Sequence, residues 1–343
     1  MSARILFAGD FRWASGSSHV IAEYVRVAGA RAADVRVSSV LGTYDEAVTR
    51  LLPYEADLRW ATHLVIVLEG NAFLDPESME AVDRAVPARR RLVIDADGRS
   101  LPPLRVGSDD NRGPRGADVW ADQFELAACP RIYPQLAPAG SDCSAVPFSY
   151  FGMPPLAEGH APSCELRYVG ANWWRFDALI HVVRAFRQVN ALGHVEVCGQ
   201  YWDGQRRSGY ESATTARLDL LDDLGVIVRP PVPFGRVVSW MSGAVLSPVL
   251  IRPVLSALGL VTPRVFETMA AHTIPLFMQR DRAIAEIVGR DGLLCLGDEP
   301  ADDMARILSN TPTYQAIAED LRAEMYNAYC YPAVFDRLLE LLS

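Results

Sequence analysis

Short apolar runs alternate with segments of helical spacing along the first half of the chain. The runs are rich in β-branched residues and cover residues 4–8, 35–40, 63–68, 91–94 and 146–148, and a helical pattern covers residues 18–28. Runs of this length, bounded by glycine, proline or polar residues, predict buried strands. Strands that alternate with helices predict βαβ units on a parallel sheet.

The same pattern returns after residues 153–162, which read MPPLAEGHAP. A stretch of proline, glycine and polar residues typically separates domains, so we place a boundary there. Beyond it we expect strands at residues 166–169, 195–198, 226–228, 244–247 and 274–277, and helices at 176–189, 312–327 and 333–342. The sequence therefore predicts an α/β protein with two Rossmann-like domains, residues 1–155 and 163–325, and a last helix, residues 326–343, that packs back on the first domain.

Composition narrows the range of possible functions. Hydrophobic residues make up 50% and charged residues 22% of the 343 residues, which is typical of a folded chain long enough for two cores. The formal charge is −9 and no long basic segment occurs, which argues against a nucleic-acid partner. All 33 basic residues are arginine, a bias typical of GC-rich bacterial genomes. Reactions that need a lysine amine, such as those of P-loop and PLP enzymes, are therefore excluded.

The six cysteines are scattered, with no pair and no cysteine–histidine cluster at the spacing of a metal site. We expect neither a structural zinc nor a disulfide framework. The longest apolar stretch, residues 244–261, contains Arg252 and two prolines, and the N-terminal apolar run is too short for a signal peptide. We therefore expect a cytoplasmic protein with no transmembrane segment.

Ligands of open α/β sheets bind beyond the carboxyl ends of the strands, where glycine turns and helix N-termini meet. The loops at these ends are residues 9–19, 69–71 and 95–98 in the first half, and 170–175, 199–201, 229–234 and 258–264 in the second. Gly170, Asn172 and Gly199 are candidate ligand-binding residues in the second half. No loop contains G-x-G-x-x-G, which argues against a nicotinamide oxidoreductase.

A proton acceptor is the next requirement for many reactions at such loops. His19 follows Gly16 and Ser17 at the start of the first helix, and an imidazole titrates near neutral pH, so His19 is our first candidate for a general base. A helix-start histidine that binds backbone or substrate is an equal alternative. Asp10 and Asp97 are second candidates, although either is also a common turn residue.

The stretch TPRVFETMAAHTIPLFM, residues 262–278, starts with a threonine cap and a proline at the first helical position, and Gly259 precedes it. It resembles the late helix and strand of group 1 glycosyltransferases with the GT-B fold, particularly the spore-coat-maturation-like branch, as do YVGANWWRFD at 168–177 and VEVCGQYW at 195–202. The resemblance implies two Rossmann-like domains that face a cleft. It also implies transfer of a sugar from a nucleotide-sugar, bound by the second domain, to a small-molecule or cell-surface acceptor, bound by the first.

The resemblance also implies roles for single residues. Glu267 would bind the donor ribose, and the backbone N–H groups of Leu260, Val261 and Thr262 would hold the diphosphate. Arg264 and Arg175 would neutralise phosphate charge and stabilise the leaving group. The nucleobase would lie near two further residues, Arg229 and Val232. The alternative for Arg264 and Glu267 is a surface ion pair at i, i+3.

Some positions depart from the pattern of the family. Gly259 stands where retaining members often carry a second glutamate, which leaves retention or inversion open, and His272 stands where the family has a small residue. Asp95 and Asp97 form a D-x-D, the metal-binding pattern of GT-A glycosyltransferases, but such pairs are common after a strand. We therefore expect no obligatory metal and no cofactor besides the nucleotide-sugar.

Several alternatives stay open. The aromatic residues of two neighbouring loops could stack on a ligand or pack between domains; they are Trp173, Trp174, Tyr201 and Trp202. A UDP-sugar 2-epimerase of the same architecture is disfavoured by the small supply of six histidines. A non-catalytic nucleotide-sugar-binding protein is the second alternative. The donor base, the sugar, the acceptor and the oligomeric state are not indicated by the sequence.

Overall fold

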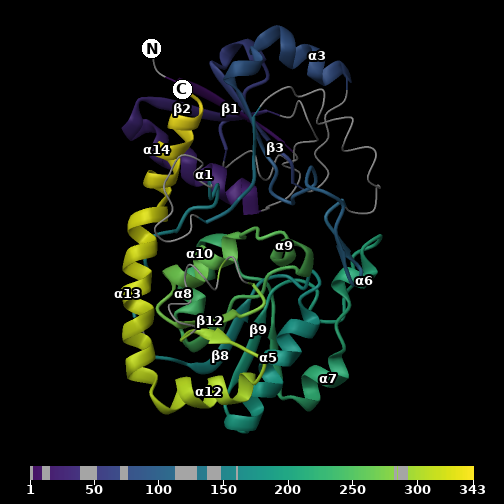
Figure 1. Cartoon of the computed structure of the whole chain (residues 1–343), viewed down its shortest axis with the longest axis vertical. Helices are drawn as coiled ribbons and strands as arrows, with labels where there is room; N and C mark the ends of the chain where they lie inside the picture. The colour runs from purple at the N-terminus through teal and green to yellow at the C-terminus, as the bar shows by residue number, and fades with distance from the viewer. Residues whose placement is uncertain are drawn as a thin grey trace.

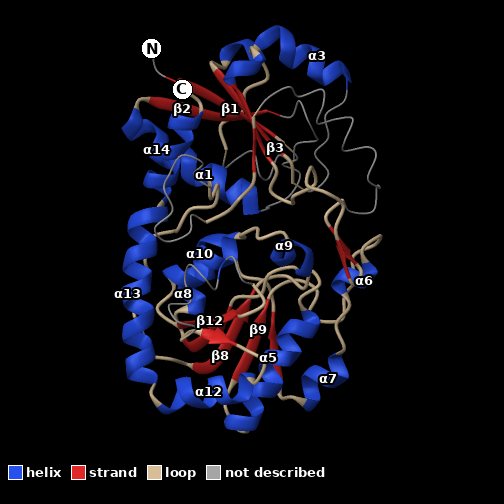
Figure 2. Cartoon of the chain, in the orientation of Figure 1, coloured by secondary structure: helices blue, strands red, loops and turns tan. Residues whose placement is uncertain are grey.

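The computed structural model describes residues 3–9, 16–38, 52–69, 76–112, 130–136, 148–159, 161–281, 284 and 293–343. Two parallel sheets, each with helices on both faces, lie one above the other in Figure 1, and the same layers are seen by secondary structure in Figure 2. The predicted fold class, two Rossmann-like halves, is confirmed.

The first sheet has five strands in the order β2-β1-β3-β4-β7. All of its pairings are parallel. The strand order reverses between β1 and β3, and the carboxyl ends on either side of such a reversal form the ligand-binding crevice of doubly wound sheets. The strands are β1 (Ala3–Ala8), β2 (Ala33–Ser38), β3 (His63–Val67), β4 (Arg91–Ile94) and β7 (Arg131–Ile132).

Side chains of β1 alternate between two cores, which explains its continuous apolar run. Ile5 and Phe7 belong to a core with the apolar faces of α1 and α14, whereas Leu6 and Ala8 pack with α3. A parallel strand that is covered on both faces needs apolar residues at every position. The helices are α1 (Gly16–Ala28), α3 (Pro76–Ala85) and α14 (Tyr331–Leu341).

The second sheet has six parallel strands in the order β10-β9-β8-β11-β12-β13, and its order reverses between β8 and β11. The strands are β8 (Cys164–Val169), β9 (Val195–Cys198), β10 (Val226–Arg229), β11 (Ala244–Pro248), β12 (Ile274–Met278) and β13 (Cys295–Leu296). The helices of this half are α5 (Phe176–Val189), α6 (Glu211–Thr214), α7 (Leu218–Asp223), α8 (Val237–Met241), α9 (Pro253–Ala257), α10 (Pro263–Ala270) and α12 (Pro300–Ser309).

The chain crosses between the two halves twice, and the crossings lie side by side. The N–H of Met153 donates to the carbonyl of Tyr329 at 2.7 Å, and Met153 and Cys330 form a parallel bridge. From there α13 (Thr311–Tyr329) runs along the second half and α14 packs on α1 (Figure 1). Within the described ranges no helix combines the length and the apolar character needed to cross a bilayer.

Charged side chains hold these last two helices in place. On α13, the buried guanidinium of Arg322 donates to the carbonyls of Met269 and Ala271 at the end of α10. On α14, Asp336 pairs with Arg31 of the first half. Carbonyls at a helix C-terminus lack intrahelical partners, so Arg322 satisfies groups that burial would otherwise leave costly.

A short hairpin was not predicted from the sequence. Its strands, β5 (Arg105–Val106) and β6 (Asp109–Asp110), pair antiparallel and contact α9 of the other half. Two-residue strands carry too little periodicity to detect. The strand predicted at residues 146–148 lies outside the described residues except for Phe148, which bridges Pro134.

Replacement of Gly199 by alanine tests how closely the loops after β8 and β9 approach. A Cβ at Gly199 would lie 2.1 Å from the carbonyl oxygen of Gly170, which is backbone and cannot rotate away. We expect Gly199→Ala to lower the free energy of unfolding by about 1–3 kcal/mol, as overpacking does. Gly235→Ala is the control, since a Cβ there meets nothing within 4 Å. Equal denaturant midpoints for the two variants would contradict this packing.

Candidate active site

The carboxyl ends of the two sheets meet at the interface between the halves. Asp97, which follows β4, pairs with Arg252, which follows β11, at 3.4 Å. The ring of His19 on α1 stacks on Phe234 of the second half, with centroids 5.6 Å apart and planes 18° apart. The two ligand-binding ends therefore border the same region, as two domains that face a cleft require.

On the second half, arginines gather at the reversal of strand order. Arg175 lies half-buried at the start of α5, where its Nε donates to the carbonyl of Leu250 at 2.8 Å, and Leu250 follows β11. Burial lowers the pKa of Arg175, and the positive charges of Arg252 and Arg264 lower it further. Within the described part of the chain the hydrogen bonds of Arg175 go to backbone carbonyls and none to a carboxylate. This crevice is therefore suited to an anionic ligand.

The start of α10 adds a second polar group to this crevice. Thr262 takes the N-cap position, but its hydroxyl caps nothing, and the oxygen is buried with no hydrogen-bond partner among the described residues. A buried hydroxyl without a partner is costly, and a ligand oxygen beside the helix N-terminus would satisfy it.

Arg264 and Glu267 form the ion pair that i, i+3 spacing allows. Nη1 of Arg264 lies 3.0 Å from Oε2 of Glu267. The side chains are only 14% and 6% exposed, so the pair is enclosed and does not lie on the surface. Both residues therefore lie inside the α10 end of the site, and their contacts with a donor stay predictions.

Two of the three backbone N–H groups that were expected to hold the diphosphate have partners within the protein. The N–H of Leu260 donates to the carbonyl of Leu255 at 2.9 Å, and the N–H of Val261 donates to the carbonyl of Pro134 at 3.0 Å. These bonds tie the loop to α9 and to the first half, so neither group is free for a diphosphate. Thr262 alone of the three remains a candidate.

The remaining candidates of the second half lie in the loops after β8 and β9, which pack closely together. Gly170 and Gly199 approach so closely that a side chain at Gly199 would overlap the Gly170 carbonyl. Asn172 is buried, and its amide donates to the carbonyls of Tyr201 and Thr215 at 3.3 and 2.9 Å. These residues hold the loops together, and their contact with a donor is still a prediction.

Arg229 and Val232 lie at the β10 end of the second sheet. Arg229 pairs at 2.9 Å with Glu196, a buried carboxylate on β9 that also binds Arg167 at 2.7 Å. Val232 is half-buried and packs on a small cluster around Cys198. Arg229 thus shares one carboxylate with Arg167, and the expected place of a nucleobase beside Arg229 and Val232 is untested.

The tryptophans differ in their surroundings. Trp202 is fully buried and donates from Nε1 to the carbonyl of Gly170 at 2.6 Å, which makes it a packing residue. Trp173 lies among Tyr201 and Tyr210. Trp174 donates to Ser108 of the β5–β6 hairpin at 3.0 Å, so it contributes to the interface between the halves.

The candidates of the first half surround the start of α1. Gly16 is the first residue of α1, and Asp10 lies outside the described residues. Ser17 is buried, and its N–H donates to Oε2 of Glu69 at 3.3 Å. His19 is half-buried against Phe234 and stays a candidate base.

The two aspartates of the D-x-D are engaged within the protein. Asp95 is a turn residue that accepts hydrogen bonds from the N–H groups of Arg99 and Ser100 and from the Ser100 hydroxyl. Asp97 has one oxygen at 3.0 Å from Arg99 and the other at 3.4 Å from Arg252. In the described ranges no group of histidine, cysteine or acidic side chains could hold a metal ion. With both oxygens paired, Asp97 is a weaker candidate for a base than the sequence suggested.

Glu69 was not among the residues selected from the sequence, although its loop was. It lies two residues after the end of β3, at the reversal between β1 and β3. Burial raises the pKa of Glu69 to about 7, the negative charge of Asp97 adds to the increase, and hydrogen bonds from Ser17 oppose it. Glu69 could have been selected from the sequence because it is the first charged residue after the apolar run 63–68.

Arg252 and Asp109 were also missed. Asp109 is fully buried, and its two oxygens accept from Nη2 of Arg252 at 2.8 Å and from the N–H of Val254 at 3.0 Å. The Arg252 guanidinium lies 4.9 Å from the ring centroid of Trp174. Arg252 could have been noticed as the single charged residue inside the apolar stretch 244–261. Its partner, Asp109, could not be identified from the sequence.

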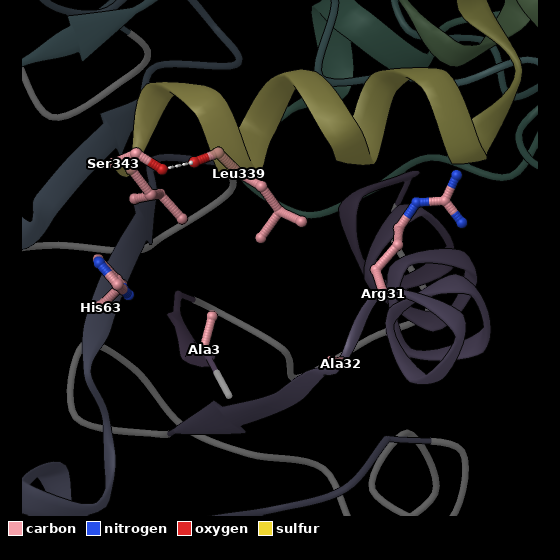
Figure 3. Close-up of a pocket in the computed structure, with 7 residues that line it drawn as sticks. Ala3, Arg31, Ala32, His63, Leu339 and Ser343 are labelled. Carbon is pink, nitrogen blue, oxygen red and sulfur yellow. Dashed lines mark hydrogen bonds between the residues drawn. The ribbon is translucent and has the colours of Figure 1, made fainter. Parts of the chain in front are cut away.

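A separate cavity of about 520 Å³ lies at the opposite ends of the strands (Figure 3). Ala3 and His63, the first residues of β1 and β3, line it together with Arg31 and the end of α14. Burial lowers the pKa of His63, and the charge of Arg90 adds to this effect. Amino ends of parallel strands do not hold the ligand crevice of such sheets, so this cavity is not the candidate site.

No protein-family model matches the sequence, and no curated protein matches it. Solved structures do. BGT of T4 phage in complex with its UDP-glucose substrate matches with a TM-score of 0.57 at 13% identity over 100% of both chains. An alpha-glucosyltransferase in complex with UDP and a 13-mer DNA containing a HMU base matches with a TM-score of 0.61 at 12% identity, again over 100% of both chains.

The chain has the GT-B fold. A glycosyltransferase from Rickettsia africae shares it, with a TM-score of 0.54 at 10% identity over 99% of this chain and 98% of that one. Because the matches extend over whole chains, the GT-B fold accounts for both sheets and for the final helices. At these identities the similarity establishes the fold, and the spore-coat-maturation-like branch stays a prediction.

Replacement of Arg252 by methionine tests the join between the GT-B domains. The variant leaves Asp109 as a buried carboxylate with one N–H donor, and breaking a buried pair on one side costs about 3–5 kcal/mol. We expect a loss of that size in the free energy of unfolding by urea. Arg217→Met is the matched control, because Arg217 and Asp219 pair with 63% and 66% exposure and should contribute little. Similar losses in both variants would contradict the role of Arg252.

The pKa of Glu69 predicts a pH-dependent stability. Between its ordinary pKa of 4.5 and about 7 the folded state keeps a proton that the unfolded state has released, so the stability of the wild type falls as pH rises through this window. Glu69→Gln lacks this titration. We expect the variant to gain up to about 3 kcal/mol relative to the wild type between pH 4 and pH 8, measured by urea unfolding. A pH-independent difference would show that Glu69 titrates normally.

Proposed function

We propose that the chain is a glycosyltransferase that binds a nucleotide-sugar on its second domain and transfers the sugar to an acceptor on its first. The half-buried Arg175 carries this proposal. It lies at the reversal of strand order without a carboxylate partner among the described residues, and the charges of Arg252 and Arg264 bear on it. A nucleoside diphosphate is an anion of the size and charge that guanidinium groups bind by paired hydrogen bonds.

The reaction is a displacement at the anomeric carbon of the donor. An acceptor oxygen attacks that carbon, the bond from carbon to the diphosphate oxygen breaks, and the electron pair leaves with the diphosphate. Arg175 and Arg264 would stabilise the charge that develops on the leaving group, with the Thr262 hydroxyl beside it. Glu267 would accept from the ribose hydroxyls, while its ion pair at 3.0 Å holds Arg264 in position.

The comparisons suggest which donor to test first. BGT of T4 phage was solved with UDP-glucose and the alpha-glucosyltransferase with UDP, so a uridine donor is our first choice. The alpha-glucosyltransferase was also solved with DNA, whereas this chain has a formal charge of −9. We therefore propose a small-molecule or glycan acceptor, a cytoplasmic enzyme, and arginine side chains in place of an obligatory metal.

A non-catalytic nucleotide-sugar-binding protein is the alternative. Arg264 is already paired with Glu267, and both oxygens of Asp97 are paired with arginines. Side chains that are held in such pairs are less available for catalysis. The same arrangement would therefore also suit a protein that binds a donor without turning it over. Release of nucleoside diphosphate from a bound donor separates an enzyme from a binder.

Thermal unfolding with a panel of UDP-, GDP-, ADP- and dTDP-glucose, with NAD as control, tests the donor site. A donor at 100 times its Kd stabilises the folded state by about 2.7 kcal/mol. We expect stabilisation by one nucleotide family, lost in Arg175→Met and kept in Arg184→Met, which changes an exposed arginine of the same helix. Stabilisation by NAD, or by no nucleotide-sugar, would contradict the proposal.

A further inference from the structure

We propose that Glu69 is the residue that takes the proton from the acceptor, and that the transfer therefore inverts the anomeric centre. This inference rests on the proposed function and assigns the base and the stereochemistry that the sequence left open. The base acts on the acceptor as it attacks from the side opposite the leaving group. A carboxylate on the acceptor domain, across the interface from the arginines, is placed for that attack.

Glu69 stands where the first sheet would hold a ligand. It follows β3 at the reversal between β1 and β3, and α1 begins beside it, with the N–H of Ser17 at 3.3 Å from its Oε2. Two residues further along α1, His19 contacts Phe234 of the donor domain. Glu69 therefore lies on the edge of the acceptor domain that faces the donor domain.

A short series of charges connects Glu69 with the donor arginines. Asp97 acts on Glu69 through its charge, Arg252 lies 3.4 Å from Asp97, and Arg252 acts in turn on Arg175. Asp97 and Arg252 thus connect the carboxylate of one domain with the phosphate-binding candidate of the other. The two ends of this series would thus lie on opposite sides of a bound sugar.

Glu69 has the free accepting capacity that a base needs. A carboxylate offers about four acceptor positions. Asp95 uses three of its own within its turn, and Asp97 and Asp109 have both oxygens paired. Among the residues that the structure describes, Ser17 is the one that donates to Glu69. Of the acidic residues described at this edge, Glu69 is the one left to accept a proton from a ligand.

The groups that face Glu69 tune it for neutral pH. They are Asp97 and Arg99 after β4, Ser17 on α1 and Tyr150, whose hydroxyl lies beside Ser17. Burial and Asp97 raise the pKa of Glu69 to about 7, against the charge of Arg99 and the hydrogen bonds from Ser17. A base whose pKa is near the working pH combines a useful unprotonated fraction with a useful proton affinity.

The step balances without any other reactant. The acceptor oxygen forms a bond to the anomeric carbon, its proton moves to an Oε of Glu69, and the bond to the diphosphate breaks with the electron pair on the diphosphate. When water is the acceptor, the product is the free sugar. Azide carries no proton, so it forms the glycosyl azide with no need for a base.

The test measures release of nucleoside diphosphate from the donor that stabilises the wild type, with water or azide as acceptor, between pH 5 and 9. We expect Glu69→Gln to lower release into water by about 10²–10⁴-fold. Azide should restore release in Glu69→Ala and give the glycosyl azide of inverted configuration. Glu77→Gln, an exposed glutamate on α3, should behave as the wild type.

The pH profile separates a base from a structural carboxylate. In the wild type, kcat/KM should fall below about pH 7, where Glu69 becomes protonated. Asp97→Asn should move this fall to lower pH, because it removes the negative charge that helps to raise the pKa of Glu69. Glu69→Gln should abolish the fall.

Each outcome decides the proposal. Normal turnover by Glu69→Gln, no rescue by azide, or a glycosyl azide of retained configuration would overturn the role of Glu69 and leave the donor reaction standing. Loss of the acidic limb in His19→Asn, with Glu69→Gln unaffected, would move the role to His19. Absence of diphosphate release by the wild type with either acceptor would overturn the proposed function and this inference together.

Discussion

The arrangement of the two domains depends on the charge of Arg252. This arginine belongs to the donor domain, yet its guanidinium is neutralised by two carboxylates of the other domain, Asp109 at 2.8 Å and Asp97 at 3.4 Å. A buried ion pair is stable only when geometry is good and the remaining polar atoms are satisfied. The second oxygen of Asp109 meets this requirement through the N–H of Val254 at the start of α9. The pairing therefore joins the facing sheets, together with the contacts of Trp174 with Ser108 and of Val261 with Pro134.

Charge is divided between the two sides of this interface. Arginines dominate the donor side, where Arg175 and Arg264 lie near the ends of the second sheet. Carboxylates dominate the acceptor side, where Glu69 and Asp97 follow neighbouring strands. Such a division suits a reaction in which one partner leaves as an anion and the other loses a proton. Burial is the main cause of the raised pKa of Glu69, and the negative charge of Asp97 on the same side adds to it.

Local patterns were readable from the sequence. The runs at 91–94 and 195–198 match β4 and β9 residue for residue, although each strand also carries one buried charged residue, Arg91 and Glu196. The pair Arg264–Glu267 was also predictable, since its spacing lies within one helical turn. Contacts between residues that are far apart in the sequence could not be predicted. Arg252 and Asp109 are 143 residues apart in sequence, and no periodicity connects them.

The two chain crossings beside Met153 and Cys330 have a mechanical consequence. Because they lie side by side, they define a single hinge, with Gly152 packed so closely on the ring of Tyr331 that a Cβ there would lie 2.6 Å from it. Figure 1 shows α13 and α14 along one side of the molecule and α6 on the other. A small rotation about this hinge would displace the far side most. The ion pair between Arg252 and Asp109 of the β5–β6 hairpin, far from the hinge, would then oppose this rotation most effectively.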